Sequence, residues 1–173
     1  MYRHFLILCI LSATLQMQAV EEGKCPVEQI VPERLPELLT PRCGHSTLFV
    51  NGELTLLGGH TTGFVPTPTA EYFADGKWHL MQMVYNHDNG FAVVMQTDTT
   101  DEVIIGGGHS EPLGIGQTFT MERYTPKTHS FEGFGCLDLR RVLANATQMA
   151  DGSVIISGNH YAARCHCLLR RSQ

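Results

Sequence analysis

Three ten-residue windows of this chain share one pattern of polar and apolar positions. Each window opens with a polar turn, continues with three or four residues rich in Leu, Ile and Val, and closes with Gly-rich residues and a histidine. The windows are NGELTLLGGH at 51–60, TDEVIIGGGH at 100–109 and DGSVIISGNH at 151–160. A short apolar run between turn signals predicts a strand buried on both faces. The glycines that follow allow the backbone to turn sharply or to approach a neighbour closely.

A further strand is predicted before each window, so that every copy begins with a hairpin. These preceding strands fall within residues 45–50, 90–96 and 145–150. The first two copies also match downstream, where residues 70–73 and 121–124 lead through polar turns to Trp78 and Phe131. Each full copy therefore holds four short strands in about 50 residues, which is the period of a propeller blade of the kelch type.

Glycine pairs followed by ordered aromatic residues carry a resemblance to a known family. The residues that carry it are Gly58-Gly59, Gly107-Gly108, Glu71-Tyr72 with Trp78, and Glu122 with Tyr124 and Phe131. The pattern, over roughly residues 42–160, resembles the kelch repeat and the secreted bacterial, galactose-oxidase-like proteins that carry it. This resemblance implies an all-β fold with about two and a half four-stranded β-propeller blades in an incomplete ring. The third copy departs from the pattern, because Ser157-Gly158-Asn159 stands where a double glycine is expected.

The last twelve residues differ in character from the rest. Residues 162–173 read AARCHCLLRRSQ and show no strand pattern, and all 17 acidic residues of the chain lie before them. Two and a half blades cannot close a ring, because propellers usually need at least four. We therefore expect a truncated fragment of a longer propeller, broken close to residue 161. The alternative is a natural short chain that self-associates through its open blade edges.

The N-terminus has the features of an export signal. A polar start with Arg3 precedes the apolar stretch 5–15, which is too short to span a bilayer. The domain organisation expected is a signal peptide (1–19), a proline-rich lead-in arm (20–41), kelch-type blades (42–161) and an atypical basic tail (162–173). The mature protein is then exported, either periplasmic or extracellular, and has no membrane segment after cleavage; the alternative is a buried N-terminal strand.

Export implies an oxidising compartment, so the cysteines can pair. Five of the six cysteines remain after signal cleavage, which leaves at least one thiol free or paired between chains. Cys25 with Cys43 is the most economical disulfide, because it would pin the lead-in arm to the start of the blades. Sequence spacing alone cannot decide this pairing.

The closing histidines are the candidate ligand-binding residues. His60, His109 and His160 occupy equivalent positions 49 and 51 residues apart, which a propeller would place in a ring about its axis. Such imidazoles can contact a sugar or a metal. The alternative is that each histidine caps its Gly-rich turn through the backbone. No carboxylate or cysteine recurs beside the histidines, so neither a metal nor another cofactor is predicted.

The remaining repeated side chains fit structural roles. Glu71 and Glu122 recur, which indicates a role in the blade rather than a catalytic acid pair. Tyr72, Trp78 and Tyr124 either pack between blades or line a sugar platform. No catalytic residue is assigned.

Composition limits the classes of function. The chain has 173 residues, 43% of them apolar, and a net charge of −5 with no basic stripe, which argues against nucleic-acid binding. We expect a binding module for a carbohydrate or a protein, with its ligand on the predicted loops 61–69 and 110–118. The alternative is part of a sugar-acting enzyme of the same fold, of the mutarotase or oxidase type. For a copper oxidase, the resemblance implies two Tyr, two His and a Cys cross-linked to Tyr. We do not assign this set to residues of this sequence.

Overall fold

The computed structural model describes residues 33–96, 101–159 and 166–169. The chain divides into two compact units, Met1–Arg34 and Leu35–Gln173, and the strands that the structure describes belong to the second. The described backbone is nearly all β, with one short 3₁₀ turn, η1 (Pro112–Gly114), and no α-helix. The predicted all-β fold class is confirmed. In the described part of the chain, no helix has the length and apolar character needed to cross a bilayer.

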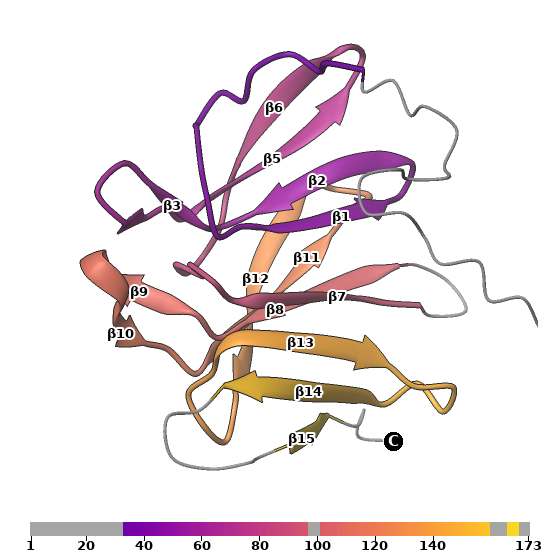
Figure 1. Ribbon diagram of the computed structural model, residues 1–173. Coiled ribbons are helices and arrows are strands. Elements are labelled where there is room, and N and C mark those ends of the chain that lie inside the picture. The colour runs from indigo at the N-terminus through magenta and orange to yellow at the C-terminus, as the bar shows by residue number, and fades with distance from the viewer. Residues whose placement is uncertain (1–32, 97–100, 160–165, 170–173) are drawn as a thin grey trace, which may run out of the picture. The chain divides into compact units, whose positions relative to one another are not determined.

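The first sheet is a four-stranded antiparallel meander (Figure 1). Its strands, in spatial order, are β1 (Ser46–Val50), β2 (Glu53–Leu57), β5 (Thr69–Ala74) and β6 (Lys77–Gln82). Asn51-Gly52 joins β1 to β2 and Asp75-Gly76 joins β5 to β6, and all four residues have positive φ. Asn-Gly and Asp-Gly suit tight hairpin turns because these residues tolerate that conformation. The hairpin and the two downstream strands predicted for the first copy are confirmed.

The second sheet repeats the first strand for strand. Its strands, in spatial order, are β7 (Phe91–Met95), β8 (Glu102–Gly106), β11 (Thr120–Thr125) and β12 (Ser130–Cys136). Leu56 pairs with Glu71 in the first sheet, and Ile105 pairs with Glu122 in the second. The two predicted full copies therefore share one register.

The third sheet has three described strands and corrects one expectation. They are β13 (Val142–Gln148), β14 (Val154–Asn159) and β15 (His166–Leu169), all antiparallel. We predicted no strand in residues 162–173, but β15 pairs along β14. The physical reason is that β14 is an apolar strand whose second edge needs backbone partners, and backbone pairing requires no particular side-chain pattern.

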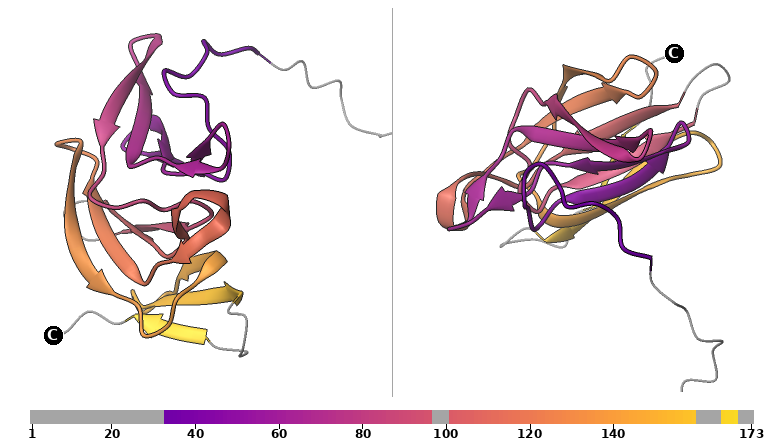
Figure 2. Two further views of the ribbon diagram at one scale, coloured as in Figure 1. Left: turned by 90° about the vertical axis from the view of Figure 1, so that its left-hand side faces the viewer. Right: turned by 90° about the horizontal axis from the view of Figure 1, so that it is seen from above.

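The sheets are arranged as consecutive blades. Strand β7 lies beside both β1 and β13, so the first strands of the three sheets are neighbours (Figures 1 and 2). This is a propeller-like arrangement, and the described sheets form no closed ring.

Apolar side chains fill the space between neighbouring sheets. The first and second sheets enclose Val50, Leu57, Ala70, Met81, Met83, Val103, Ile105 and Tyr124. The second and third enclose Phe91, Val93, Met95, Ile104, Met121, Leu137, Ala144, Val154 and Ile156. Each large apolar side chain removed from water contributes about 1.5–3 kcal/mol. The core therefore lies between blades, so each blade depends on its neighbour.

The glycine pairs allow one blade to approach the next. Gly58 and Gly59 have φ of 68° and 86°, and Gly107 and Gly108 have φ of 66° and 90°. A β-carbon on Gly58 would lie 2.7 Å from the carbonyl oxygen of His87, which leads into the second blade. Glycine is required because a side chain would both strain the backbone and block this approach. Gly158 also has positive φ, but its close neighbour is Ala144 within its own sheet.

A buried carboxylate on the third strand of the first blade holds the segment that leads into β1. Glu71 is fully buried and accepts hydrogen bonds from the amides of Leu39 and Thr40 at 2.8 and 2.9 Å. The guanidinium of Arg42 donates to the same carboxylate at 2.8 Å and to the carbonyl of Gly58 at 2.9 Å. A buried charge is tolerated only when it is paired in this way.

The second blade repeats this arrangement with different chemistry. Glu122 is fully buried and accepts from the amide of Val84 at 2.8 Å. His87 Nε2 lies 3.1 Å from the Glu122 carboxylate, and His87 Nδ1 donates to the carbonyl of Gly107 at 2.7 Å. We call each such set of carboxylate, amides and cationic or imidazole side chain a carboxylate clamp.

The close approach at the glycine pair gives the first prediction. Gly59→Ala would place a methyl group against the Cys43 carbonyl and 2.9 Å from the His45 amide nitrogen. Gly52→Ala is the matched control, because Gly52 also has positive φ but has no atom within 4 Å of its β-carbon position. The control should lose about 1 kcal/mol of unfolding free energy, and Gly59→Ala a further 1–3 kcal/mol or so. Equal losses in urea unfolding would contradict the packing role of Gly59.

The clamp gives the second prediction. Glu71→Gln removes the charge that neutralises the buried Arg42 and should lower the unfolding free energy by about 3–5 kcal/mol. Asp75→Asn removes an exposed carboxylate from the same sheet and should change it by less than about 0.5 kcal/mol. Thermal or denaturant unfolding measures both. A Glu71→Gln protein as stable as the Asp75→Asn protein would show that the ion pair between Arg42 and Glu71 contributes nothing to the unfolding free energy.

Candidate functional site

Two short hairpins project from the same side of the first two blades (Figure 1). They are β3 (His60–Thr61) with β4 (Val65–Pro66), and β9 (His109–Glu111) with β10 (Ile115–Gln117). Each hairpin interrupts its blade between the second and third strands, where the sequence predicted loops. The amide of Leu113 donates to the carbonyl of Phe64 at 3.1 Å, so the two hairpins touch. We call their joint surface the hairpin face.

Large apolar side chains stand at the tips of the hairpin face. Phe64 is 59% exposed and Leu113 is 71% exposed, and Val65 and Ile115 beside them are also exposed. Phe64 and Leu113 both have positive φ, 55° and 61°. This conformation is unfavourable for bulky residues, and such strain concentrates at functional sites. Two neighbouring hairpins thus hold strained apolar residues out in solvent, which indicates a contact surface.

A buried aspartate joins the bases of the two hairpins. Asp88 is 2% exposed, and its carboxylate lies 2.6 Å from His60 Nδ1 and 3.7 Å from His109 Nδ1. The side-chain amide of Asn89 donates to the same carboxylate at 3.0 Å. The contact with His60 is charge-assisted and spans two blades, because His60 follows the first blade's second strand and Asp88 precedes β7.

Backbone pairing sets this cluster in place. Cys43 pairs with His60 and Asp88 pairs with His109 through isolated antiparallel bridges. His60 packs against Phe64, with ring centroids 5.0 Å apart. The nearest atoms to a β-carbon built on Gly114 are Cε1 and Nε2 of His109, both at 3.8 Å. Each histidine therefore lies at the base of its own hairpin and supports the tip above it.

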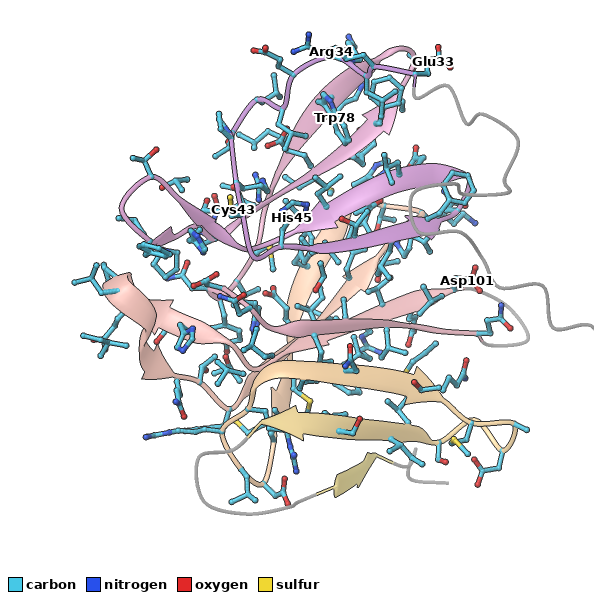
Figure 3. The ribbon with its side chains drawn as sticks, viewed as in Figure 1. Glu33, Arg34, Cys43, His45, Trp78 and Asp101 are labelled. Carbon is cyan, nitrogen blue, oxygen red and sulfur yellow. The ribbon has the colours of Figure 1, made fainter. Side chains whose placement is uncertain are left out.

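A hollow of about 350 Å³ opens beside the first hairpin. Its lining residues are Pro41, Arg42, Cys43, His60, Thr61, Thr62, Gly63 and Phe64. Cys43 is exposed and forms no disulfide with any residue that the structure describes. Figure 3 shows Cys43 and His45 on the segment that leads into β1. Burial, and next the charge of Arg42, lower the pKa of His45, while Glu71 acts in the opposite direction.

A second hollow of about 470 Å³ lies beneath the other hairpin. It is lined by Pro68, Val84, Tyr85, Asn86, Ser110, Thr118 and Thr120. The amide of Asn86 donates to the carbonyl of Ser110 at 3.0 Å, so the segment between the blades is tied to the hairpin here. Both hollows therefore border the hairpin face.

The structure brings together only part of the predicted site. His60 and His109 both lie beside the Asp88 carboxylate, at 2.6 and 3.7 Å from Nδ1. His160 and Cys25 lie outside the described residues, so the ring of three histidines and the Cys25–Cys43 disulfide stay predictions. Sequence reasoning missed Asp88, which is 28 residues from its partner His60. The only local signal was its position in the polar run before β7.

The predicted aromatic residues pack within and between blades. Tyr124 is fully buried and stacks on Phe131 with centroids 4.7 Å apart, and burial raises the pKa of its phenol. Tyr72 stacks on His129 of the second blade at 3.8 Å. Trp78 donates from its indole nitrogen to the carbonyl of Pro36 at 2.9 Å and so anchors the lead-in segment.

The predicted tyrosines Tyr72 and Tyr124 do not fit a copper centre. No group of three or more His, Cys, Asp or Glu residues in this part of the chain is arranged to hold a metal ion. Tyr124 is enclosed in the core between two blades, and Tyr72 is stacked between imidazole rings. Neither phenol is therefore free to act as a ligand beside His60 and His109.

Comparison with solved structures identifies the fold. A fungal alcohol oxidase of the AA5 family, solved in complex with copper, superposes with a TM-score of 0.57 and 21% identity. The match covers 68% of this chain and 27% of that protein, so this chain spans well under a third of its relative's length. It shows a galactose-oxidase-like β fold and, at this identity, the fold alone. No protein-family model and no curated protein matches the sequence.

The His–Asp cluster gives the third prediction. Replacing both His60 and His109 with Ala removes both imidazole contacts of the buried Asp88 carboxylate. Of the contacts described above, the one with Asn89 remains. The unfolding free energy should fall by about 2 kcal/mol or more, as expected for a lost charged hydrogen bond. Thr62→Ala, an exposed change in the same hairpin, is the control. An unchanged melting temperature in the double variant would show that the histidines do not support the hairpins.

Proposed function

We propose that this chain is part of an exported kelch-type propeller that binds a macromolecular ligand through the hairpin face. The observation that carries the proposal is the pair of touching hairpins with Phe64 and Leu113 strained and exposed at their tips. Apolar side chains grouped on a surface are more favourable when another molecule covers them. Their exposure on the hairpins therefore favours a binding surface. The core between the blades supplies the rigid support.

The chemistry of the tips favours a protein or peptide ligand over a carbohydrate. Three of the four apolar tip residues, Val65, Leu113 and Ile115, are aliphatic. Sugar rings are usually held on aromatic faces with several polar groups around them, and the tips offer one aromatic ring. Exposed aliphatic and aromatic side chains grouped beside two hollows favour contact with an apolar side chain of a partner.

A sugar-acting enzyme is the second candidate, because of the His60–Asp88 pair. The Asp88 carboxylate lies 2.6 Å from His60 Nδ1, and such a contact orients an imidazole ring through one of its nitrogens. A general base needs this arrangement, and His60 lines a hollow.

The number of blades supports a larger ring. Besides the two short hairpins, the described residues form three blade-like sheets, and propellers usually close with four or more blades. We propose that further blades of a longer product complete the ring. Self-association of copies of this chain is the alternative, and the mass of the purified protein in solution distinguishes them.

The hairpin face gives the fourth prediction. A random peptide library displayed on phage should yield peptides with an apolar consensus that bind the full chain. Phe64→Ser combined with Leu113→Ser should weaken these peptides about tenfold or more, because truncated anchor residues dominate binding losses. The melting temperature should change little, since both side chains are largely exposed and Phe64 loses only its ring contact with His60.

The control is Phe49→Ser, which removes an even more exposed phenylalanine (73% exposed) from β1, outside the hairpins. Peptides that bind the control and the double variant with equal affinity would contradict the proposed surface. Binding to defined oligosaccharides on a glycan array, with no peptide enrichment, would identify a carbohydrate ligand instead. Turnover of a sugar anomer that is lost in His60→Ala would favour the enzyme.

A further inference from the structure

The clamps of the two complete blades differ in one side chain. Arg42 comes directly before the residue that bridges to His60, and His87 comes directly before the residue that bridges to His109. Both Arg42 and His87 are buried. The repeat therefore places an arginine in the first blade and a histidine in the second blade at one equivalent position.

The arginine of the first blade donates to acceptors on three sides. Arg42 reaches the carbonyl of Thr40 at 3.3 Å, the carbonyl of Thr69 at 2.6 Å and the hydroxyl of Thr69 at 2.9 Å. It also reaches the carbonyl of Gly58 and the carboxylate of Glu71. One planar guanidinium, with its five N–H donors, serves all of these acceptors.

The histidine of the second blade takes over two of these contacts. The His87 imidazole donates to the carbonyl of Gly107 and lies beside the carboxylate of Glu122. These groups are the equivalents of Gly58 and Glu71. An imidazole has two ring nitrogens, so these two contacts use both of them. The equivalents of Thr40 and Thr69 receive no cationic donor from His87.

Those two equivalents line the second hollow, of about 470 Å³. Tyr85 has the position of Thr40, two residues before the basic or imidazole side chain of its clamp. Thr120 has the position of Thr69, two residues before the buried carboxylate. Thr118, whose hydroxyl lies 2.7 Å from that of Thr120, lines the hollow as well. The hollow is therefore found at the place that the Arg42 guanidinium has in the first blade.

Backbone contacts support this equivalence independently. The carbonyl of Thr69 accepts from the amide of Gly58 at 3.2 Å, and the carbonyl of Thr120 accepts from the amide of Gly107 at the same distance. The acceptor atoms that serve Arg42 in the first blade thus have the same backbone setting in the second blade.

The side chains around the hollow suit a planar cation. Tyr85 is 38% exposed, and its ring offers a face on which a guanidinium can stack. Glu122 lies two residues beyond Thr120 and therefore on the same face of β11, where its buried carboxylate supplies negative charge. None of the described lining residues is basic, so an incoming cation meets no like charge among them.

We propose that the second hollow binds a guanidinium group, carried by an arginine side chain of the ligand, in the place that Arg42 occupies in the first blade. The group would donate to Thr120 and stack on Tyr85. The recognition of the guanidinium rests on the comparison of the two blades. That the arginine belongs to a peptide rests on the proposed function.

Capped tripeptides test the proposal on the full chain. The probe is acetyl-Gly-Arg-Gly-amide, and its control has citrulline, which has the same shape without the charge, in place of arginine. Titration followed by nuclear magnetic resonance should show the arginine peptide binding about tenfold more tightly, as expected for hydrogen bonds from a charged group. A lysine peptide should bind less tightly than the arginine peptide, because its ammonium is neither planar nor forked. Absence of arginine-peptide binding, or equal affinity for citrulline or lysine, would overturn the proposal.

Two variants locate the probe in the second hollow. Thr120→Val removes an acceptor and should weaken the arginine peptide several-fold, whereas Thr47→Val, an exposed change on β1, should not. His87→Arg supplies a guanidinium from within the chain, as Arg42 does, and should abolish binding. A folded His87→Arg protein that still prefers arginine to citrulline would overturn the proposal. If this variant does not fold, equal affinity in Thr120→Val and Thr47→Val would overturn it instead.

The apolar tips provide the control that separates this site from the hairpin face. Phe64→Ser combined with Leu113→Ser should leave the affinity for the arginine peptide unchanged, because the probe carries no apolar anchor. Arginine binding can therefore succeed when apolar peptides fail to bind, and the reverse. Loss of the arginine peptide in this double variant would place the probe on the tips and overturn the proposal.

Discussion

The structure depends on a carboxylate buried on the third strand of each complete blade. Glu71 and Glu122 are removed from water, and such a charge is tolerated only with donors around it. Those donors are backbone amides and a basic side chain from the segment that enters the blade. The clamp therefore ties the third strand of each complete blade to the segment that leads into its first strand.

The same constraint places the candidate site. His87 belongs to the second clamp, and the next residue, Asp88, contacts His60 at 2.6 Å and lies 3.7 Å from His109. Because His87 is fixed by Glu122 and by the Gly107 carbonyl, Asp88 has little freedom to move. The two hairpins then rise from the histidines, and their strained tips carry the exposed apolar residues. The structural repeat thus positions the hairpin tips. The blades themselves do not need apolar residues at those tips.

The sequence predicted the blades well because their signals are local. Short apolar runs, the polar turns beside them and the period of about 50 residues predicted the hairpins and the paired downstream strands. Asp88 was missed because its partner is distant in sequence and its own neighbourhood reads only as a polar link. The strands β3, β4, β9 and β10 are too short to give an alternating pattern. Strand β15 was missed because its pairing comes from the backbone edge of β14.

Native-state hydrogen exchange of the Leu39, Thr40 and Val84 amides tests the central role of the clamps most directly. These amides lie outside the strands, on partly exposed residues, and donate only to the buried carboxylates. They should be as strongly protected as the amides of β2 and β8, because they open only when a blade opens. Exchange at the rate of free loops, with β2 and β8 still protected, would contradict the account.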